Sequence, residues 1–297
     1  MTDRLRITWY TDPHNIWCWG FEPTARRLEI VYPDSVELEI RQGGLFEDFS
    51  PVREQWARMS GGQWKDSIRA FFDAVGSQHR MPMDAESMVE SVDDFNSTWP
   101  ACIAAKAADL QGREIGRRYL RGLREAWCID GRGIHARTVQ TDVARETGLD
   151  VEAFTKALED GSAEQAFRVD REECERLQVT GFPSFEIRRG DASARINGWQ
   201  TWEIFEDVMR QVDPDVIAKV IEPTEESVEG LLQRHDRWAT REIAAVLGVP
   251  DDDAEILLEE LEGRGKIWRH SVGSGLIWAR TPVIAKDVNA VRDSAIR

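Results

Sequence analysis

The chain has 297 residues with 54 Asp or Glu against 38 Lys or Arg, and its formal net charge of −16 argues against a general nucleic-acid-binding protein, which needs a basic surface. Only six of the basic residues are lysine, a composition typical of halophilic proteins or, alternatively, of an acidic protein from a GC-rich genome. No stretch approaches the roughly 18 apolar residues of a membrane span and the N-terminus has no apolar signal segment, so we expect a cytoplasmic protein with no membrane partner.

The first predicted elements are a strand, a helix and a strand. Residues 5–10 are mostly apolar and residues 35–41 alternate between apolar and charged, so both are predicted strands. Residues 18–31 between them are predicted to form one helix. Because crossovers between parallel strands are right-handed, we expect a β-α-β unit and an α/β fold.

The segment between the first strand and this helix has the layout of a dithiol redox site that lacks its first cysteine. In a C-x-x-C site, the first sulfur lies at a helix N-terminus that stabilises its thiolate, and the second sulfur lies one turn further on. Asn15 occupies the first position and Cys18 the second. A carboxamide cannot attack a disulfide, but its oxygen can cap the helix. The sequence therefore predicts the turn without the dithiol chemistry.

Residues 52–177 are predicted to be helical. Apolar side chains recur at spacings of three and four, as from Ile68 to Val75. Capping residues from Asn96 onward are followed by Pro100, which indicates a helix start. The segment is too long for a loop. We expect a helical subdomain that packs over the active-site end of the sheet.

A hairpin and a helix are predicted to complete this part of the chain. Residues 185–187 and 194–196 are the candidate strands, and the turn between them contains Gly-Asp. Residues 201–212 have the pattern of an amphipathic helix. Pro183 follows an aromatic residue at the start of the hairpin, where a cis bond can form, although only about one X-Pro bond in twenty is cis.

Five motifs occur in order along the chain, namely Asp12–Gly20, Gln42–Leu45, Ser97–Ala101, Val179–Phe185 and Gly198–Gln200. Together they resemble the DsbA-like branch of the thioredoxin superfamily, in particular its FrnE-type and disulfide-isomerase-like members. The resemblance covers residues 1–213. It implies a thioredoxin fold with a large inserted helical subdomain, a cis bond before Pro183 and thiol–disulfide exchange. Asn15 departs from the family pattern at the position that this exchange needs.

The resemblance also implies a ligand groove. In the family, the cis-proline loop lies against the active-site turn and offers its backbone to an extended peptide or thiol, a form of strand addition. We therefore expect Trp17, Trp19, Phe182 and Pro183 to bind the substrate, with the two tryptophans as groove wall and core. No thiol is needed at Asn15 for such binding.

Cys18, His14 and Asn15 are the candidate catalytic residues. Cys18 gains some thiolate stabilisation from the helix start, but its apolar neighbours favour a raised pKa. His14 could lower that pKa as an imidazolium or act as a neutral base, and the alternative is a solvated loop histidine. Asp12 is expected to cap the turn or, if buried, to accept a proton. Asn15 could donate its amide NH₂ to a bound thiolate.

The other cysteines predict neither a metal site nor a second redox pair. Cys102, Cys128 and Cys174 lie in helical patterns without C-x-x-C spacing, so we expect buried small apolar side chains. The alternative is that one of them meets Cys18 in space and restores a dithiol. No metal is expected, and the only candidate ligand of a cofactor type is a low-molecular-weight thiol.

A second module is predicted at the C-terminal end. Residues 214–224 contain two prolines and are a predicted linker. Residues 225–280 have the pattern of three helices and two strands, with Thr240 as the cap of the second helix, and residues 281–297 form a tail. The stretch 239–267 resembles winged helix-turn-helix modules.

The charge of this module disfavours DNA as its partner. Residues 225–280 contain twelve Asp or Glu against seven Lys or Arg, a net charge of −5, and the third helix begins with three aspartates at 251–253. Phosphate neutralisation supplies most non-specific affinity for DNA, so an acidic helix in the groove is unfavourable. We expect contacts with a protein, or a homodimer, in preference to DNA. The basic residues left for a DNA-facing edge are Arg237, Arg241, Lys266 and Arg269.

Three classes of function remain open from the sequence. The first is a redox-silent protein that holds a peptide or protein partner in the groove as an adaptor or regulator. The second is a kappa-class glutathione transferase-like or isomerase-like enzyme that binds a small thiol at Asn15. The third is a thiol oxidoreductase that acts through Cys18. We favour the first, because the nucleophilic cysteine is missing while the loop at Pro183 and the added module are present.

Overall fold

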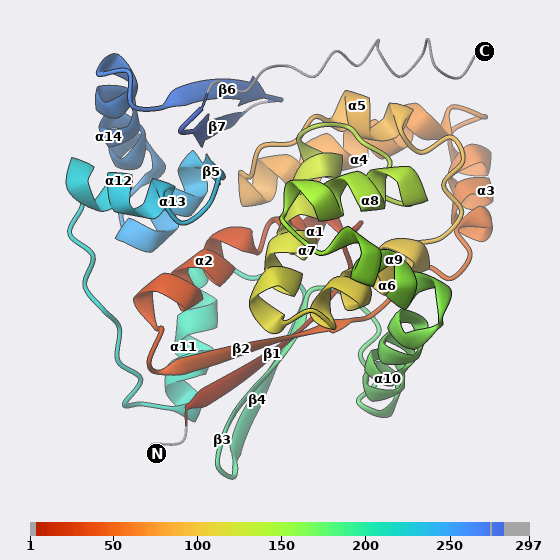
Figure 1. The fold of residues 1–297 in the computed structure, drawn as a ribbon, viewed down its shortest axis with the longest axis horizontal. Helices are drawn as coiled ribbons and strands as arrows, with labels where there is room; N and C mark the ends of the chain where they lie inside the picture. The colour runs from red at the N-terminus through yellow and green to blue at the C-terminus, as the bar shows by residue number, and fades with distance from the viewer. Residues whose placement is uncertain (1–3, 274, 282–297) are drawn as a thin grey trace.

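A four-stranded mixed sheet organises the first part of the chain in this computed structural model, which describes residues 4–273 and 275–281 (Figure 1). The strand order is β2-β1-β3-β4, with β1 parallel to β2 and the other pairs antiparallel, as the predicted β-α-β unit and hairpin require. The tail predicted at 281–297 lies outside the described residues apart from Thr281. The strands are β1 (Leu5–Thr11), β2 (Val36–Gln42), β3 (Ser184–Arg189) and β4 (Ala192–Asn197).

The inner face of the sheet is apolar. Side chains alternate along a strand, and Leu5, Ile7 and Trp9 of β1 are all buried on one side. They share one core with apolar residues of α2 (Glu22–Val31) and α11 (Trp202–Val212). Burial of this face fixes the register of β1, because a shift by one residue would bring Arg6 into the core.

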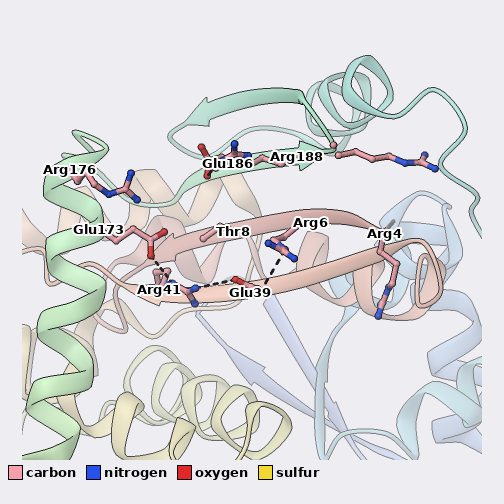
Figure 2. Close-up of a pocket in the computed structure, with 11 residues that line it drawn as sticks. Arg4, Arg6, Thr8, Glu39, Arg41, Glu173, Arg176, Glu186 and Arg188 are labelled. Carbon is pink, nitrogen blue, oxygen red and sulfur yellow. Dashed lines mark hydrogen bonds and ion pairs between the residues drawn. The ribbon is translucent and has the colours of Figure 1, made fainter. Parts of the chain in front are cut away.

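The outer face of the sheet is charged, and Figure 2 shows it. Arg6 points away from the core and is largely exposed. Arg41 of β2 contacts Glu39 on its own strand and Glu173 of α10 (Ser162–Arg176), each at 3.1 Å. The helix α10 therefore covers only one end of this face through ion pairs.

The helix predicted over residues 18–31 is divided into two. A short α1 (Ile16–Trp19) ends at Gly20, and α2 begins at Glu22. Pro23 lies in the first turn of α2, where its missing N–H leaves no hydrogen bond unmade. The prediction of one helix was wrong because it gave no weight to this proline as a start signal.

Between β2 and β3 the chain is a succession of helices. Several of them form a second core around Trp19, Leu123 and Phe154. Figure 1 shows these helices beside the sheet, over the end at which α1 begins. No helix within the described ranges is long and apolar enough to cross a membrane. Besides α10, the helices are α3 (Ser50–Met59), α4 (Trp64–His79), α5 (Ala85–Glu90), α6 (Trp99–Asp109), α7 (Arg113–Cys128), α8 (Arg137–Glu146) and α9 (Val151–Glu159).

The C-terminal part contains three helices and a small antiparallel sheet, and residues 213–223 before it contain no helix or strand. The strand order is β5-β7-β6. The pair β6 and β7 was predicted from the sequence, whereas the three-residue β5 was not. The elements are α12 (Glu225–Leu232), β5 (Arg237–Ala239), α13 (Thr240–Leu247), α14 (Asp251–Gly263), β6 (Trp268–Val272) and β7 (Gly275–Ala279).

The start of α13 differs from the prediction. Ala239 is the N-cap residue and Thr240 is already helical, so Thr240 does not cap the helix. The Thr240 hydroxyl instead accepts a hydrogen bond of 2.9 Å from the indole N–H of Trp278. Glu242 satisfies the helix start, because its carboxylate accepts from the backbone N–H of Ala239 at 2.8 Å.

The C-terminal part packs directly on the first part. The helix α13 lies against α2 (Figure 1). Glu242 is fully buried and accepts two hydrogen bonds from Arg121 of α7, at 2.7 and 3.0 Å. Arg27 of α2 donates to the backbone carbonyl of Ala245 at 2.5 Å. These contacts are charge-assisted, and the pair Arg121–Glu242 is buried, so they hold the two parts in a defined orientation.

Candidate functional site

Asn15 links the turn before α1 to the loop before β3. Its side-chain oxygen accepts from the backbone N–H of Trp17 at 2.9 Å and caps α1, as the sequence predicted. Its amide nitrogen donates to the carbonyl of Phe182 at 3.0 Å. Both ends of the carboxamide are therefore used within the protein. The position that carries a nucleophile in a dithiol site acts here as a bridge.

The loop before β3 contains a cis peptide bond between Phe182 and Pro183. The Pro183 carbonyl accepts from the backbone N–H of Gly198 at 2.9 Å, and the Phe182 carbonyl accepts from Asn15. The Ser184 hydroxyl donates to the carbonyl of Gly181 at 2.7 Å. A ligand that added to this loop as a strand would have to replace these internal partners.

Gly43 holds the Gly-Gly-Leu turn against the same loop. Its backbone N–H donates to the carbonyl of Thr11 at 2.7 Å. A Cβ atom at Gly43 would lie 1.8 Å from Cζ of Phe182, well inside any allowed contact. Glycine is needed here because an aromatic ring lies directly on the backbone.

Cys18 is fully buried beneath this bridge. Burial raises the pKa of its thiol to about 11, although the nearby Arg124 guanidinium acts in the opposite direction. Very little thiolate exists at neutral pH, and a nucleophilic attack by Cys18 would need the turn to open. Cys102, Cys128 and Cys174 are also buried, and all four cysteines are free. No disulfide links Cys18 to any of the other three cysteines.

Asp12 lies inside the turn and connects it to a neighbouring loop by hydrogen bonds. The carboxylate is fully buried and accepts from the backbone N–H groups of His14 at 2.8 Å and Leu45 at 2.7 Å. The thiol of Cys102 also lies 3.4 Å from it. Burial raises the pKa of Asp12, and the hydrogen bonds that it accepts oppose that shift. Asp12 thus caps the turn through the N–H of His14, as expected from the sequence, and also joins the turn to the loop at Leu45.

His14 is neither a solvated loop residue nor an imidazolium. Its side chain is 7% exposed and lies against the rings of Phe95 and Trp127, with centroids 4.8 and 5.1 Å away. Burial lowers the pKa of His14 to about 3, and His135 adds to the shift. Within the described part of the chain neither ring nitrogen has a hydrogen-bond partner. A neutral ring without a partner cannot activate Cys18 by its charge.

The four predicted ligand contacts differ in exposure. Trp19 is fully buried and donates its indole N–H to the carbonyl of Pro82 at 2.9 Å, so it belongs to the core. Phe182 and Pro183 are buried as well. Trp17 is half-buried, and its ring centroid lies 5.9 Å from that of Trp199. Of the four, only Trp17 can touch a partner without a rearrangement.

A buried cluster of charges lies behind the turn, and the sequence reasoning missed it. Arg124 contacts Glu22 and the Thr11 hydroxyl, and Arg121 bridges Glu22 and Glu242. Burial raises the pKa of Glu22, but Arg124 and Arg121 outweigh this effect and the net pKa lies below its ordinary value. The available signal was the spacing of arginines at three and four residues along α7, which places them on one helix face.

Metal-binding groups do not gather at this site. In residues 4–273 and 275–281, no three His, Cys, Asp or Glu side chains are placed to share a metal ion. The arrangement can hold two loops together and present a small surface that includes Trp17. It supplies neither an exposed thiol nor a charged histidine at neutral pH.

The chain is similar to a protein family, to several curated proteins and to solved structures. The family described as thioredoxin matches residues 9–207. The chain is 28% identical over 277 residues to the ClpXP adapter protein SpxH of Shouchella clausii and 24% identical over 277 residues to that of Bacillus subtilis, covering 92% of this chain and 88% of each relative. The cytosolic disulfide reductase DsbM of Pseudomonas aeruginosa has a similar fold, with a TM-score of 0.52 and 18% identity, covering 77% of this chain and 100% of that one.

Proposed function

The chain belongs to the thioredoxin family, and from that premise we propose that it is a redox-silent adaptor that binds a protein partner. The observation that carries the proposal is the state of the active-site turn. Asn15 replaces the first cysteine and is bonded to Phe182, and Cys18 is buried with a pKa of about 11. A thioredoxin fold without an accessible thiolate retains a surface for binding and loses the means for exchange.

The relatives indicate the kind of partner. Proteins named ClpXP adapter match 92% of this chain, which extends beyond the thioredoxin match into the C-terminal part. We propose that this chain likewise brings a protein to the ClpXP protease. The cytosolic disulfide reductase shares the fold only, so its activity does not carry over.

The proposed contact surface is the rim beside the cis-proline. Trp17 and Trp199 are half-buried, and the backbone around Thr180 and Gly181 is exposed. The indole N–H of Trp199 donates to the carbonyl of Gly20 at 2.8 Å, which fixes the second ring. A fixed Trp199 ring with the Trp17 ring 5.9 Å from it, beside an exposed loop, suits a protein contact, because aromatic side chains dominate the energetics of interfaces.

We propose that residues 225–280 form a winged helix-turn-helix module that contacts protein rather than DNA. The division into a thioredoxin domain at 1–213, its helical insertion at about 52–177 and a linker at 214–224 is part of this proposal. Each residue of the predicted basic edge is ion-paired within the chain, which leaves little free cation for phosphates. The pairs are Arg237–Asp130, Arg241–Asp251, Lys266–Glu229 and Arg269–Glu259.

The two enzyme hypotheses are less well supported. A thiol ligand would have to reach the second N–H of the Asn15 amide, because the first donates to Phe182, and Asn15 is only 9% exposed. A monothiol mechanism would need Cys18 to reach the surface, and its exposed fraction is zero. The Cys18→Ala variant and the insulin reduction assay described next test the monothiol hypothesis as well.

The test is a degradation assay with purified ClpXP, ATP and cell extract, in which protein loss is measured by quantitative mass spectrometry with and without this chain. We expect at least one protein to be lost faster in its presence, and Trp17→Ala to slow that loss. Phe71→Ala is the control, because Phe71 is another aromatic residue that reaches the surface but lies on α4. Insulin reduction is measured in parallel. Turnover that disappears in Cys18→Ala, without any accelerated degradation, would contradict the proposal.

A further inference from the structure

The hairpin of β6 and β7 packs on the segment between α4 and α5. In Figure 1 this hairpin extends from the C-terminal part toward these two helices. A Cβ atom at Gly273 would lie 2.0 Å from the carbonyl oxygen of Met83. A Cβ atom at Gly275 would lie 2.8 Å from Cγ of Pro82. Both distances are shorter than an allowed contact, so the hairpin approaches this segment as closely as only glycine permits.

The same segment supports Trp19 of α1. The carbonyl of Pro82 accepts a hydrogen bond of 2.9 Å from the indole N–H of Trp19. Val272 and Ile277 of the hairpin are buried in the same apolar core as the Trp19 ring. Pro82 therefore contacts Gly275 with its ring and Trp19 with its carbonyl. Because this region is closely packed, a shift of the hairpin is transmitted to the Trp19 side chain.

A second route leads from the C-terminal part to the same tryptophan. The Arg121 guanidinium lies 4.4 Å from the centre of the Trp19 ring, where a cation is attracted to the ring face. Glu242 of α13 is fully buried and accepts two hydrogen bonds from Arg121, at 2.7 and 3.0 Å. Arg121 also contacts Glu22 and Glu125. Glu242 thus helps to fix the cation that lies on the Trp19 ring.

The helix α1 depends on contacts of this kind for its position. It has four residues, and a single turn has too few internal hydrogen bonds to be stable by itself. Its C-terminal end is held by α4, because a Cβ atom at Gly20 would lie 2.6 Å from the ring of His79. Trp17 and Cys18 belong to the same turn as Trp19. A displacement of Trp19 therefore moves both of them.

We propose that the C-terminal part positions α1 through Trp19, which holds the Trp17 ring in place and keeps Cys18 closed. Trp19 is a positioning residue, because it is fully buried and acts on the rim only through α1. The two supports come from different elements, the β6–β7 hairpin and α13, and they converge on one side chain. The inference rests on the proposed function only where Trp17 is taken as a contact of the partner.

The test compares two cysteines of the full-length protein by native labelling with iodoacetamide, followed by mass spectrometry. Cys174 is the internal reference, because it is also buried but lies on α10, which packs on α6, α9 and β2. Gly275→Ala should raise the labelling rate of Cys18 at least ten-fold and that of Cys174 less than two-fold. Gly230→Ala makes the same change in α12, where a Cβ atom meets open space, and should alter neither rate more than two-fold.

A second variant removes the other support. Glu242→Gln keeps an oxygen for the N–H of Ala239 but loses the charge that holds Arg121. It should also raise the labelling rate of Cys18 at least ten-fold, with Cys174 again changed less than two-fold. An equal rise at both cysteines in either variant would indicate general destabilisation and overturn the proposal. An unchanged rate at Cys18 in Gly275→Ala would overturn it too.

A measurement on the unmodified protein covers the case in which a variant fails to fold. Hydrogen exchange is followed by mass spectrometry at rising urea concentrations below the unfolding transition. The amides of α1 should lose protection at or before the urea concentration at which those of β6 and β7 do, because local opening of the support releases the helix. Protection of α1 that outlasts that of β6 and β7 would overturn the proposal. Neither readout needs a partner, so a failure of the adaptor function alone would leave both unchanged.

Discussion

The buried ring of His14 should make the protein sensitive to mild acid. In the folded chain the pKa of His14 is lowered from 6.5 to about 3, because the ring is buried beside Phe95 and Trp127. The unfolded chain takes up a proton near pH 6.5, and the folded chain does not. Stability is therefore complete above pH 6.5 and is lost progressively as the pH falls toward about 3.

The size of the effect follows from the two pKa values. One pKa unit corresponds to about 1.4 kcal/mol, so the full shift could remove about 5 kcal/mol by pH 3. Between pH 7 and pH 5 the linkage relation gives a loss of about 2 kcal/mol from His14 alone. His79 and His235 are lowered to about 4 and about 2 by burial first of all, and they act in the same direction. A variant that changes only His14 removes the pH dependence due to His14 and keeps the pH dependence due to His79 and His235.

The assay is urea unfolding followed by circular dichroism at pH 7 and pH 5. His14→Leu replaces the ring with an apolar side chain that does not titrate and suits its aromatic surroundings. We expect its free energy of unfolding to fall by about 2 kcal/mol less than that of the unmodified protein over this pH interval. His270→Leu is the matched control, because it makes the same substitution at a histidine of β6 that is only half-buried. Identical pH dependence in His14→Leu and the unmodified protein would refute the reasoning.

Three further outcomes test the site. Cys18 should resist iodoacetamide in the native protein at pH 7.5 and react fully in urea, because its thiol is buried and has a pKa of about 11. Labelling is followed by mass spectrometry, and rapid labelling of the native protein would contradict the burial of Cys18. Asn15→Ala should lower the free energy of unfolding by about 2 kcal/mol, because it removes the helix cap and the hydrogen bond to Phe182. An unchanged urea unfolding curve would argue against both hydrogen bonds. Gly43→Ala should displace the Phe182 ring and lower the melting temperature. Gly181→Ala should leave the melting temperature unchanged, because a Cβ atom at Gly181 meets open space. Equal melting temperatures for the two variants would show that the Phe182 ring moves freely.

Local features of the fold were predictable because they depend on residues close together in the sequence. Alternation along β2 and the hairpin at β3 and β4 follow from which face each side chain meets. The cap at Asn15 follows from a polar side chain whose oxygen accepts from the backbone N–H two residues further on. The division of the helix at Gly20 was missed, although Pro23 carried the signal.

The sequence by itself determined that the turn lacks a C-x-x-C pair, because Asn15 stands where the first sulfur would be. Only the tertiary structure decided what that asparagine does. Its partner Phe182 is 167 residues away, and the burial of Cys18 and His14 depends on helices packed over the turn. Desolvation and long-range hydrogen bonds are properties of the assembled fold, so no pattern within the turn could have fixed the pKa of either residue.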